Sequence, residues 1–320
     1  MISVRNLTKI YKTSIKGRNF ISDLFNRKYK EIVALDKVSF EVRENELVGF
    51  IGPNGAGKTT TLKILAGILY PTSGDVNVLG YFPFAKKRPF LKQISFVMGQ
   101  RNQLIWDLPA VDTFKLNKEI YEVSDNQYHK AIDELTSLLN AQKLIEKPVK
   151  TLSLGERMKM ELIASLIHNP KLIFFDEPTI GLDIFSQEII RDFIKKYQKH
   201  YRATIMLTSH YMEDVKRLAR RIIVISKGKI LYNGDLKAIV EKYSMEKLVT
   251  VTLESEVDQK KLSEIGNAIT YKFPTVSYKI DRNLIPEKIN LINKLLPYSD
   301  LAVEEEPIEE IIKKLFSGKN

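Results

Sequence analysis

The residue types best suited to chemistry form one run of glycines with a lysine and a threonine, Gly52-Pro53-Asn54-Gly55-Ala56-Gly57-Lys58-Thr59. Its spacing is G-x-x-x-x-G-K-[ST], and it lies between an apolar stretch typical of a strand and a helical pattern that begins at Thr60. Such glycines allow successive backbone N–H groups to point at phosphates, and the helix adds the positive end of its dipole. A glycine turn that only linked strand to helix would need neither the lysine nor the threonine. We therefore expect a nucleotide phosphate site, with Lys58 on the β- and γ-phosphates, Thr59 on magnesium and Thr60 beside them.

Two adjacent carboxylates follow a second apolar stretch. Leu172–Phe175 has the pattern of a buried strand, and Asp176 and Glu177 come directly after it. Ligands of open α/β sheets bind at the carboxyl ends of the strands, so these carboxylates are expected beside the phosphates. Asp176 would hold magnesium, and Glu177 would be the general base that polarises an attacking water. A turn of helix-favouring acids before Pro178 is the alternative interpretation.

The elements that must position these residues alternate between strand and helix. Strands are expected at Ile2–Leu7, Val38–Val42, Leu47–Ile51, Ile94–Met98, Leu172–Phe175, Thr204–Thr208 and Ile222–Ile225. This alternation favours an α/β fold with a mostly parallel sheet covered on both faces. We place a domain boundary near Tyr243, so that residues 1–243 form the first domain and residues 244–320 a small α+β domain.

The expected elements of the small domain are three strands and three helices. The strands are Val249–Leu253, Thr275–Ile280 and Leu301–Glu304, and the helices are Gln259–Ile265, Pro286–Leu296 and Ile308–Phe316.

Residues 12–30 form a basic insert between two expected strands. The segment has six Lys or Arg against one Asp, and it carries Phe20, Ile21, Leu24 and Phe25 at helical spacing. This pattern predicts a short basic amphipathic helix. The helix could pack on its own domain with a solvated basic face, or it could lie on a membrane surface or a partner protein.

Composition limits the class of protein. The 320 residues contain no cysteine and four histidines, which excludes disulfides and thiolate zinc sites. The longest apolar stretches, such as Ile64–Tyr70, fall far short of the ~20 residues that a membrane-spanning helix needs, and the N-terminus lacks a secretory signal pattern. The net charge of +11 favours anionic partners such as lipid headgroups, nucleic acid or nucleotide phosphates, or else a well-solvated basic surface.

Residues 1–234 resemble the ATP-binding cassette (ABC) family of ATPases, with the motifs in the family's order. Leu152-Ser153-Leu154-Gly155-Glu156 is similar to the family's signature loop, which is normally leucine, serine, glycine, glycine, glutamine. The resemblance implies that Ser153 and Gly155 face the γ-phosphate bound by the opposite subunit of a dimer. Leu154 and Glu156 depart from the pattern, and Glu156 would add negative charge close to the ribose. The same serine and glutamate also form an ordinary capping box for a helix start.

Four more positions resemble functional residues of this family. Gln100 resembles the glutamine that senses magnesium, with Gln103 as a neighbouring alternative. His210 resembles the histidine that contacts the γ-phosphate. Asp183 resembles the aspartate of the family's loop that links the two active sites. Tyr11 stands where the family stacks an aromatic ring on adenine, although the insert that begins at the next residue could displace it. Together these positions imply a site for ATP and Mg²⁺.

A narrower resemblance concerns transport. The run Val97-Met98-Gly99-Gln100-Arg101-Asn102-Gln103-Leu104, followed by Trp106-Asp107-Leu108-Pro109, is similar to a bacterial exporter subgroup for drugs, antibiotics or viologens. The basic insert and the signature variant add to this similarity. It implies a P-loop NTPase domain with a helical subdomain at about residues 110–166, which pairs with a second ATPase subunit, most simply a second copy. It also implies separate membrane-spanning permease subunits and a location at the cytoplasmic face of the cell membrane.

Two rival functions remain open from the sequence. A soluble cassette ATPase that acts on nucleic acid or ribosomes would fit the positive charge, although ribosome-acting members usually carry two cassettes in one chain. A binding-only regulatory cassette is the other, and the presence of Lys58, Glu177 and His210 argues against it.

Overall fold

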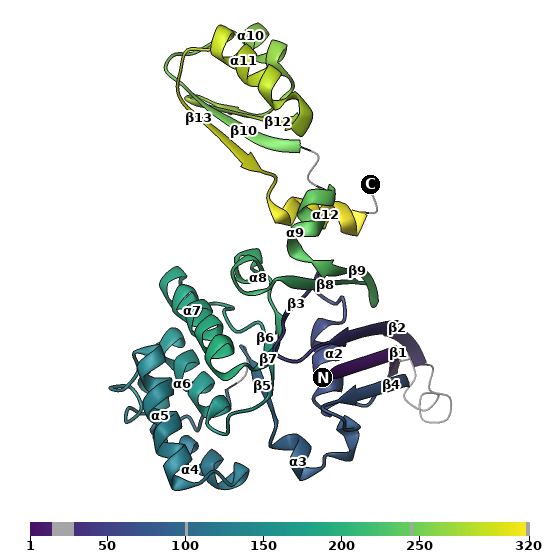
Figure 1. Ribbon diagram of the computed structural model, residues 1–320, viewed down its shortest axis with the longest axis vertical. Helices are drawn as coiled ribbons and strands as arrows, with labels where there is room; N and C mark the ends of the chain where they lie inside the picture. The colour runs from purple at the N-terminus through teal and green to yellow at the C-terminus, as the bar shows by residue number, and fades with distance from the viewer. Residues whose placement is uncertain (15–28, 100–101, 244–245, 318–320) are drawn as a thin grey trace, which may run out of the picture. The chain divides into compact units, whose positions relative to one another are not determined.

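The computed structural model describes residues 1–14, 29–99, 102–243 and 246–317, and it divides into two compact units, Met1–Asp235 and Leu236–Asn320 (Figure 1). The boundary therefore lies at the start of helix α9 (Leu236–Tyr243), whereas the sequence placed it at the end of that helix. The reason is packing, because α9 contacts the last helix of the second unit, α12 (Ile308–Ser317).

The first unit is built around a six-stranded sheet whose strands are all parallel except β9. In spatial order the strands are β5 (Ile94–Met98), β6 (Leu172–Asp176), β7 (Thr204–Thr208), β3 (Leu47–Ile51), β8 (Arg221–Ser226) and β9 (Lys229–Asp235). Ile173 and Phe175 of β6 belong to the core on the side of helices α6 and α7, whereas Leu172 and Phe174 belong to the core on the side of α2. Both faces of the sheet are thus covered, and the expected α/β fold is confirmed.

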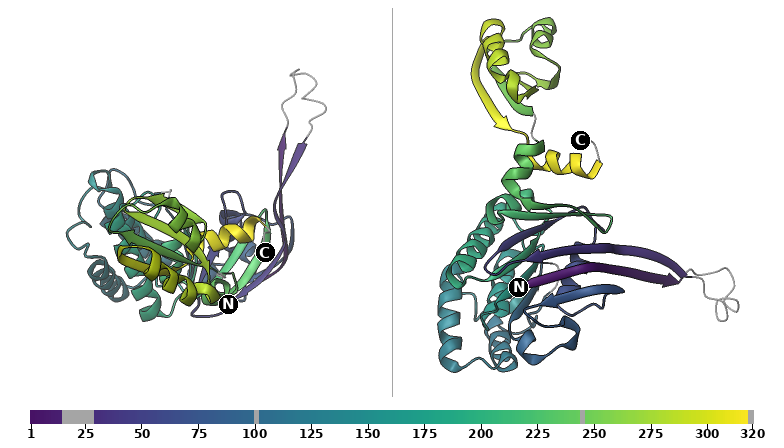
Figure 2. Two further views of the ribbon diagram at one scale, coloured as in Figure 1. Left: turned by 90° about the horizontal axis from the view of Figure 1, so that it is seen from above. Right: turned by 45° about the vertical axis from the view of Figure 1, so that its right-hand side comes forward.

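A second, antiparallel sheet was not expected as a separate layer. Its spatial order is β2 (Tyr29–Val42), β1 (Ile2–Ser14) and β4 (Ser73–Val78). β1 and β2 pair antiparallel from Ile2 with Val42 to Ser14 with Tyr29, so both strands run far past the ends predicted for them. Figure 2 shows the two strands as a ribbon that projects from the rest of the first unit. The two ends of the predicted basic helix are therefore strand, and its middle, residues 15–28, lies outside the described residues.

The helices of the first unit surround the central sheet. They are α2 (Lys58–Leu65), α3 (Arg88–Leu91), α4 (Ala110–Tyr121), α5 (Asp125–Leu139), α6 (Leu154–Leu166), α7 (Ile184–Tyr201) and α8 (Met212–Leu218), with 3₁₀ turns at Pro83–Ala85 and Val149–Thr151. α4, α5 and α6 gather at one side of the unit and pack on one another (Figure 1). They occupy the part of the chain in which the sequence predicted a helical subdomain.

The second unit has the element order β-α-β-β-α-β, followed by one more helix. Its elements after α9 are β10 (Glu246–Leu253), α10 (Gln259–Ile265), β11 (Ala268–Lys272), β12 (Thr275–Asp281), a 3₁₀ turn at Arg282–Leu284, α11 (Ile285–Leu295), β13 (Tyr298–Glu305) and α12. The sheet is antiparallel with the order β11-β12-β10-β13, and Leu262 of α10 and Ile292 of α11 share its core. The buried carboxylate of Glu306 pairs with Lys279 of β12 and Lys314 of α12, which fixes the last helix to the sheet.

Candidate functional site

The glycine-rich loop between β3 and α2 folds tightly around its own lysine. Gly55 and Gly57 have φ values of 76° and 110°, which strongly favour glycine, and a Cβ on Gly57 would lie 2.6 Å from Leu35 Cδ2. The Lys58 ammonium donates to the carbonyl oxygens of Gly52, at 2.7 Å, and Pro53, at 3.2 Å. Burial lowers the pKa of Lys58, and the neighbouring carboxylates partly offset this effect. The loop thus holds one cationic side chain at the N-terminus of a helix, as a phosphate site requires.

A hydroxyl and a carboxylate lie together beside this loop. Thr59 Oγ1 donates to Asp176 Oδ1 at 3.1 Å, and Thr208 Oγ1 donates to the same oxygen at 2.7 Å. Asp176 ends β6 and Thr208 ends the neighbouring β7, so parallel pairing brings the two side chains to one edge of the sheet. Oxygen ligands of this kind suit Mg²⁺ that is also bound to nucleotide phosphates. The residues present therefore fit the implied ion.

Glu177 and His210 are in direct contact at the same edge. His210 Nε2 lies 2.6 Å from Glu177 Oε1, and the exposed fractions of the two side chains are 33% and 15%. Glu177 has a φ of 58°, which is rare for a residue other than glycine, and its backbone N–H donates to Thr208 O at 3.0 Å. A Cβ on Gly99 would lie 2.0 Å from the Glu177 carbonyl oxygen, so β5 can approach this residue only with a glycine there.

The expected signature loop begins α6 and packs against the start of α7. Ser153 is the N-cap of α6: its Oγ accepts from the Glu156 N–H, and its own N–H donates to the Glu156 carboxylate at 2.9 Å. The bond from the Ser153 backbone N–H to the carboxylate is the largest cause of the lowered pKa of Glu156. A Cβ on Gly155 would lie 2.3 Å from Ser186 Oγ, so this glycine allows the two helix starts to touch.

Asp183 caps α7 at the same place. Its carboxylate accepts from the Ser186 N–H at 2.9 Å and from the Ser186 hydroxyl at 2.6 Å, which lowers its pKa. Ser153 and Asp183 are both exposed, whereas Gly155 of the same group is buried.

Tyr11 lies in the β1–β2 ribbon, close to the start of α2. Its hydroxyl is 3.5 Å from Thr60 Oγ1, and the Lys9 ammonium lies 5.2 Å from the centre of its ring. The side chain is exposed and pairs across the ribbon with Ile32. The insert therefore does not carry Tyr11 away from the phosphate loop.

Of the two candidate glutamines, only Gln103 is among the described residues. Gln100 lies outside the described residues. Gln103, its alternative, donates its backbone N–H to the buried Glu161 carboxylate and its side-chain amide to Phe96 O at 3.0 Å. The backbone and side-chain amides of Gln103 are thus both bonded within the protein, and burial raises the pKa of Glu161.

Sequence reasoning missed Thr208 and Gly99, which contact Asp176 and Glu177. Gly99 precedes Gln100 and Thr208 ends an apolar strand, but only the pairing of the strands shows what they touch. Within the described part of the chain, no group of three His, Asp or Glu side chains is arranged to hold a metal ion.

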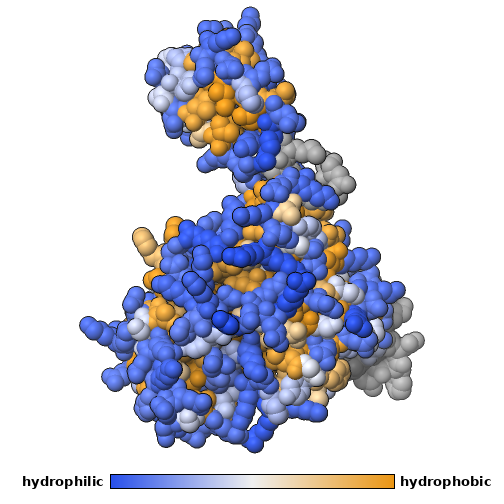
Figure 3. Space-filling model, in the orientation of Figure 1, coloured by the Kyte–Doolittle hydropathy of each residue, from blue (hydrophilic) through white to orange (hydrophobic). Residues whose placement is uncertain are grey.

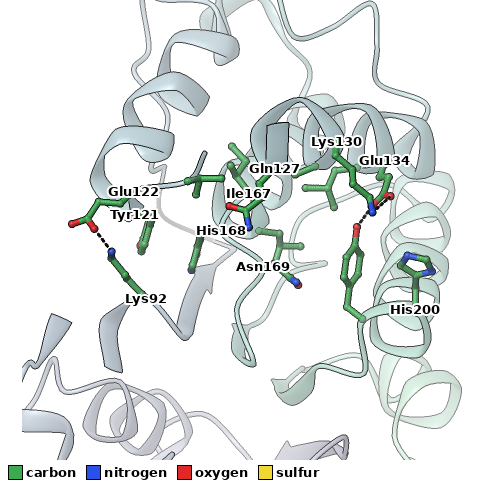
Figure 4. Close-up of a pocket in the computed structure, with 15 residues that line it drawn as sticks. Lys92, Tyr121, Glu122, Gln127, Lys130, Glu134, Ile167, His168, Asn169 and His200 are labelled. Carbon is green, nitrogen blue, oxygen red and sulfur yellow. Dashed lines mark hydrogen bonds and ion pairs between the residues drawn. The ribbon is translucent and has the colours of Figure 1, made fainter. Parts of the chain in front are cut away.

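A separate hollow of about 420 Å³ lies among α4, α5, α6 and α7 (Figure 4). It contains none of the predicted site residues. Its floor includes His168, whose ring stacks on Tyr121 with centroids 3.8 Å apart and an interplanar angle of 5°. Nε2 of this histidine lies 3.0 Å from Ile94 O, and burial lowers its pKa to about 4. No glycine among the described residues lines this hollow, so it lacks a phosphate-binding loop like that between β3 and α2.

Known proteins resemble the chain over most of its length. A family model described as "ABC transporter" matches residues 35–180. NatA, an ABC transporter ATP-binding protein of Bacillus subtilis, is 32% identical over 224 residues, which is 70% of this chain and 91% of that protein. BcrA, the bacitracin transport ATP-binding protein of Bacillus licheniformis, is 26% identical over 295 residues, which is 89% of this chain and 93% of that protein.

Solved structures resemble it as well. A dimeric bacterial ABC transporter cassette is 25% identical and aligns with a TM-score of 0.62 over 74% of this chain and 99% of that chain. The ATP-binding subunit of another ABC transporter, 21% identical, has the same fold with a TM-score of 0.63 over 76% of this chain and 93% of that chain. Among the described residues, none of the helices combines the length and apolar character needed to cross a bilayer.

Proposed function

Because the chain belongs to the family of ABC transporter ATP-binding proteins, which are the ATPases that drive transport, we propose that it hydrolyses ATP with Glu177 as the general base. The observation that supports this most directly is the 2.6 Å contact of Glu177 with His210 beside the pair formed by Asp176 and Thr59. In this proposal the loop from Gly52 to Thr59 binds the phosphates, and Lys58 supplies the positive charge.

Mg²⁺ would be held by Thr59 and Asp176, with Gln100 as a further ligand, and it would neutralise charge on the phosphates. Glu177 would accept a proton from the attacking water, and His210 would orient the carboxylate and contact the γ-phosphate. Tyr11 would stack on the adenine.

The second group of residues would serve a partner subunit. Ser153 and Gly155 would meet the nucleotide bound by a second copy, and Asp183 would link the two sites. The exposure of Ser153 and Asp183, and the close packing of Gly155 against Ser186 at the starts of α6 and α7, support this arrangement. The Glu156 carboxylate is engaged with its own helix start, which supports a capping role for it.

We further propose that the chain powers an exporter whose membrane-spanning subunits are separate proteins. A groove of about 500 Å³ in the first unit is lined by Leu91, Phe96 and Ile120, and also by Ile68, which is 55% exposed. These apolar side chains could bind a segment of such a subunit. The basic insert would rest on the same subunit or on the anionic leaflet at the cytoplasmic face. Since the relatives are transporter subunits, we do not retain action on nucleic acid.

The replacement Glu177→Gln tests the catalytic assignment. It should keep ATP binding, because Lys58 and Asp176 are untouched, but lower turnover by ~10²–10⁴-fold. ATP-bound dimers should accumulate and can be counted by light scattering after gel filtration. Glu46→Gln is the matched control, because Glu46 pairs with Arg221 and touches none of the site residues. Turnover of the Glu177→Gln variant at the wild-type rate would exclude Glu177 as the base.

A further inference from the structure

One fully buried carboxylate, that of Asp214 on α8, has no part in the chemistry described above. It is 0% exposed and accepts three hydrogen bonds. Arg191 Nε donates at 2.6 Å, and the hydroxyls of Thr179 and Ser209 donate at 2.5 Å each. A carboxylate accepts but does not donate, so it can serve three donors at once, and the buried Arg191 needs its negative charge.

Two of these donors flank the proposed catalytic residues. Thr179 follows Glu177 by two positions, and Ser209 directly precedes His210. The Ser209 hydroxyl donates a hydrogen bond to Asp214 and accepts one from the Tyr211 N–H at 2.9 Å, so the backbone is held on both sides of His210. The segment that carries the base and the segment that carries the histidine thus meet at one carboxylate.

The third donor, Arg191, is connected by hydrogen bonds to the start of α7. Arg191, which is 5% exposed, donates from its terminal nitrogen to Gln187 Oε1 at 2.8 Å. The side-chain amide of Gln187 donates in turn to Leu182 O at 3.0 Å, and Leu182 directly precedes Asp183. A continuous series of bonds therefore joins Asp214 to the loop proposed to contact the second subunit.

We propose that Asp214 is a positioning residue of the ATPase, which sets Glu177, His210 and the Asp183 loop in one mutual arrangement. This inference rests on the proposed roles of Glu177 and His210. Asp214 touches neither the nucleotide nor the water in this scheme. It acts by holding Thr179, Ser209 and Arg191, so its loss changes the alignment of the reacting groups while the phosphate loop and Lys58 stay in place.

The replacement Asp214→Asn tests the inference. An asparagine side chain presents an N–H₂ group where an acceptor is needed, and it leaves the buried Arg191 with only the more distant Glu188 carboxylate, at 3.5 Å, as a counter-charge. A misplacement of ~1 Å can cost ~10²-fold in rate, so kcat should fall by about 10- to 100-fold. The KM and the dissociation constant for ATP should stay within about twofold, because the phosphate loop and Lys58, which make most of the phosphate contacts, are unchanged.

Two milder variants keep the inference testable if the Asp214→Asn variant fails to fold. Thr179→Val and Ser209→Ala each remove one donor and keep the Arg191–Asp214 pair. Each should lower kcat with an unchanged KM, and the double variant should show less than the product of the two effects, since both act through one carboxylate. Glu46→Gln is the control for loss of an arginine–carboxylate pair: it should lower the melting temperature and leave kcat unchanged.

The result that would overturn the inference is a lower melting temperature with unchanged kcat per folded molecule in all three Asp214-network variants. That pattern would assign Asp214 to stability alone. The Glu177→Gln variant separates this outcome from failure of the proposed function. If it is inactive while the network variants are normal, only the positioning role is wrong; if it turns over ATP normally, the catalytic assignment itself is wrong.

Discussion

At the scale of single residues, Tyr11 shows how one side chain can be assigned a role from its surroundings. Its ring is exposed on a ribbon, and its hydroxyl reaches only to 3.5 Å from Thr60 Oγ1, the limit of a hydrogen bond. Stacking of a base on an aromatic ring contributes ~1–3 kcal/mol, so Tyr11→Ala should weaken ATP binding by about 5- to 150-fold. Tyr11→Phe keeps the ring and should bind within about twofold of wild type.

Titration calorimetry with ATP measures both variants of Tyr11. Equal losses in Tyr11→Ala and Tyr11→Phe would assign the affinity to the hydroxyl and not to the ring. No loss in either would place the adenine elsewhere.

The residues of the candidate site differ in how far the sequence could reveal them. Spacing alone singled out Lys58, Thr59, Asp176 and Glu177, because a glycine loop and a strand end each constrain several neighbours at once. Asp214 has no such local pattern: it lies in an amphipathic helix among other charged residues, and only tertiary contact makes it a shared acceptor. A sequence records which groups are present, but buried networks depend on elements far apart along the chain.

At the scale of elements, the close approach of β5 to the end of β6 determines where Glu177 sits. Gly99 donates its N–H to Asp176 O at 3.0 Å, and an added Cβ would lie 2.0 Å from Glu177 O and 2.9 Å from Ile180 Cγ2. Gly99→Ala should therefore push the Glu177 backbone away and reduce turnover by ~10²-fold, with a smaller effect on ATP affinity.

Steady-state hydrolysis and ATP affinity, measured side by side, check the Gly99 prediction. Gly80→Ala is the matched control, because a Cβ there meets nothing within 4 Å and only its φ of 80° is strained. It should lose some stability and no turnover. Wild-type hydrolysis by Gly99→Ala would mean that the strand end can shift freely.

The elements that were predicted well are those with strong periodic patterns. The buried parallel strands and helix α10 begin and end at or near the predicted residues. The strands β4, β9 and β11 were missed, and all three lie at the edge of a sheet. Every residue of β11 is exposed, so it shows no apolar alternation from which a strand could be inferred. Pairing with a neighbour, not local pattern, creates such strands.

At the scale of the whole molecule, charge and apolar surface bear on where the protein works. The face shown in Figure 3 is largely hydrophilic with scattered apolar patches, in keeping with the net charge of +11. Each Lys or Arg near an anionic leaflet contributes ~1 kcal/mol, so the basic insert can assist docking but not anchor the chain by itself. Replacing Arg27, Lys28 and Lys30 by Glu should weaken association with membranes that contain the partner, most strongly at low salt.

Flotation of these membranes at low and high salt measures the association, with ATPase activity assayed in parallel. The control makes the same change of charge at Lys195, Lys196 and Lys199, which are exposed on α7. It should float as wild type does. Identical flotation of the insert variant and this control would leave the insert as a segment that packs on its own unit.

The stacked pair of His168 and Tyr121 has a consequence for proton linkage. The folded protein keeps this imidazole neutral down to about pH 4, whereas an ordinary histidine takes up a proton near pH 6.5. Between these values the unfolded chain binds a proton that the folded chain does not, so the free energy of unfolding falls as the pH falls, by up to ~3 kcal/mol in total. His168→Phe can keep the stacking and removes the titration. Its stability relative to wild type, measured by urea unfolding, should therefore improve steadily from pH 7 to pH 4, and parallel curves for the two proteins would show that another group governs the acid sensitivity.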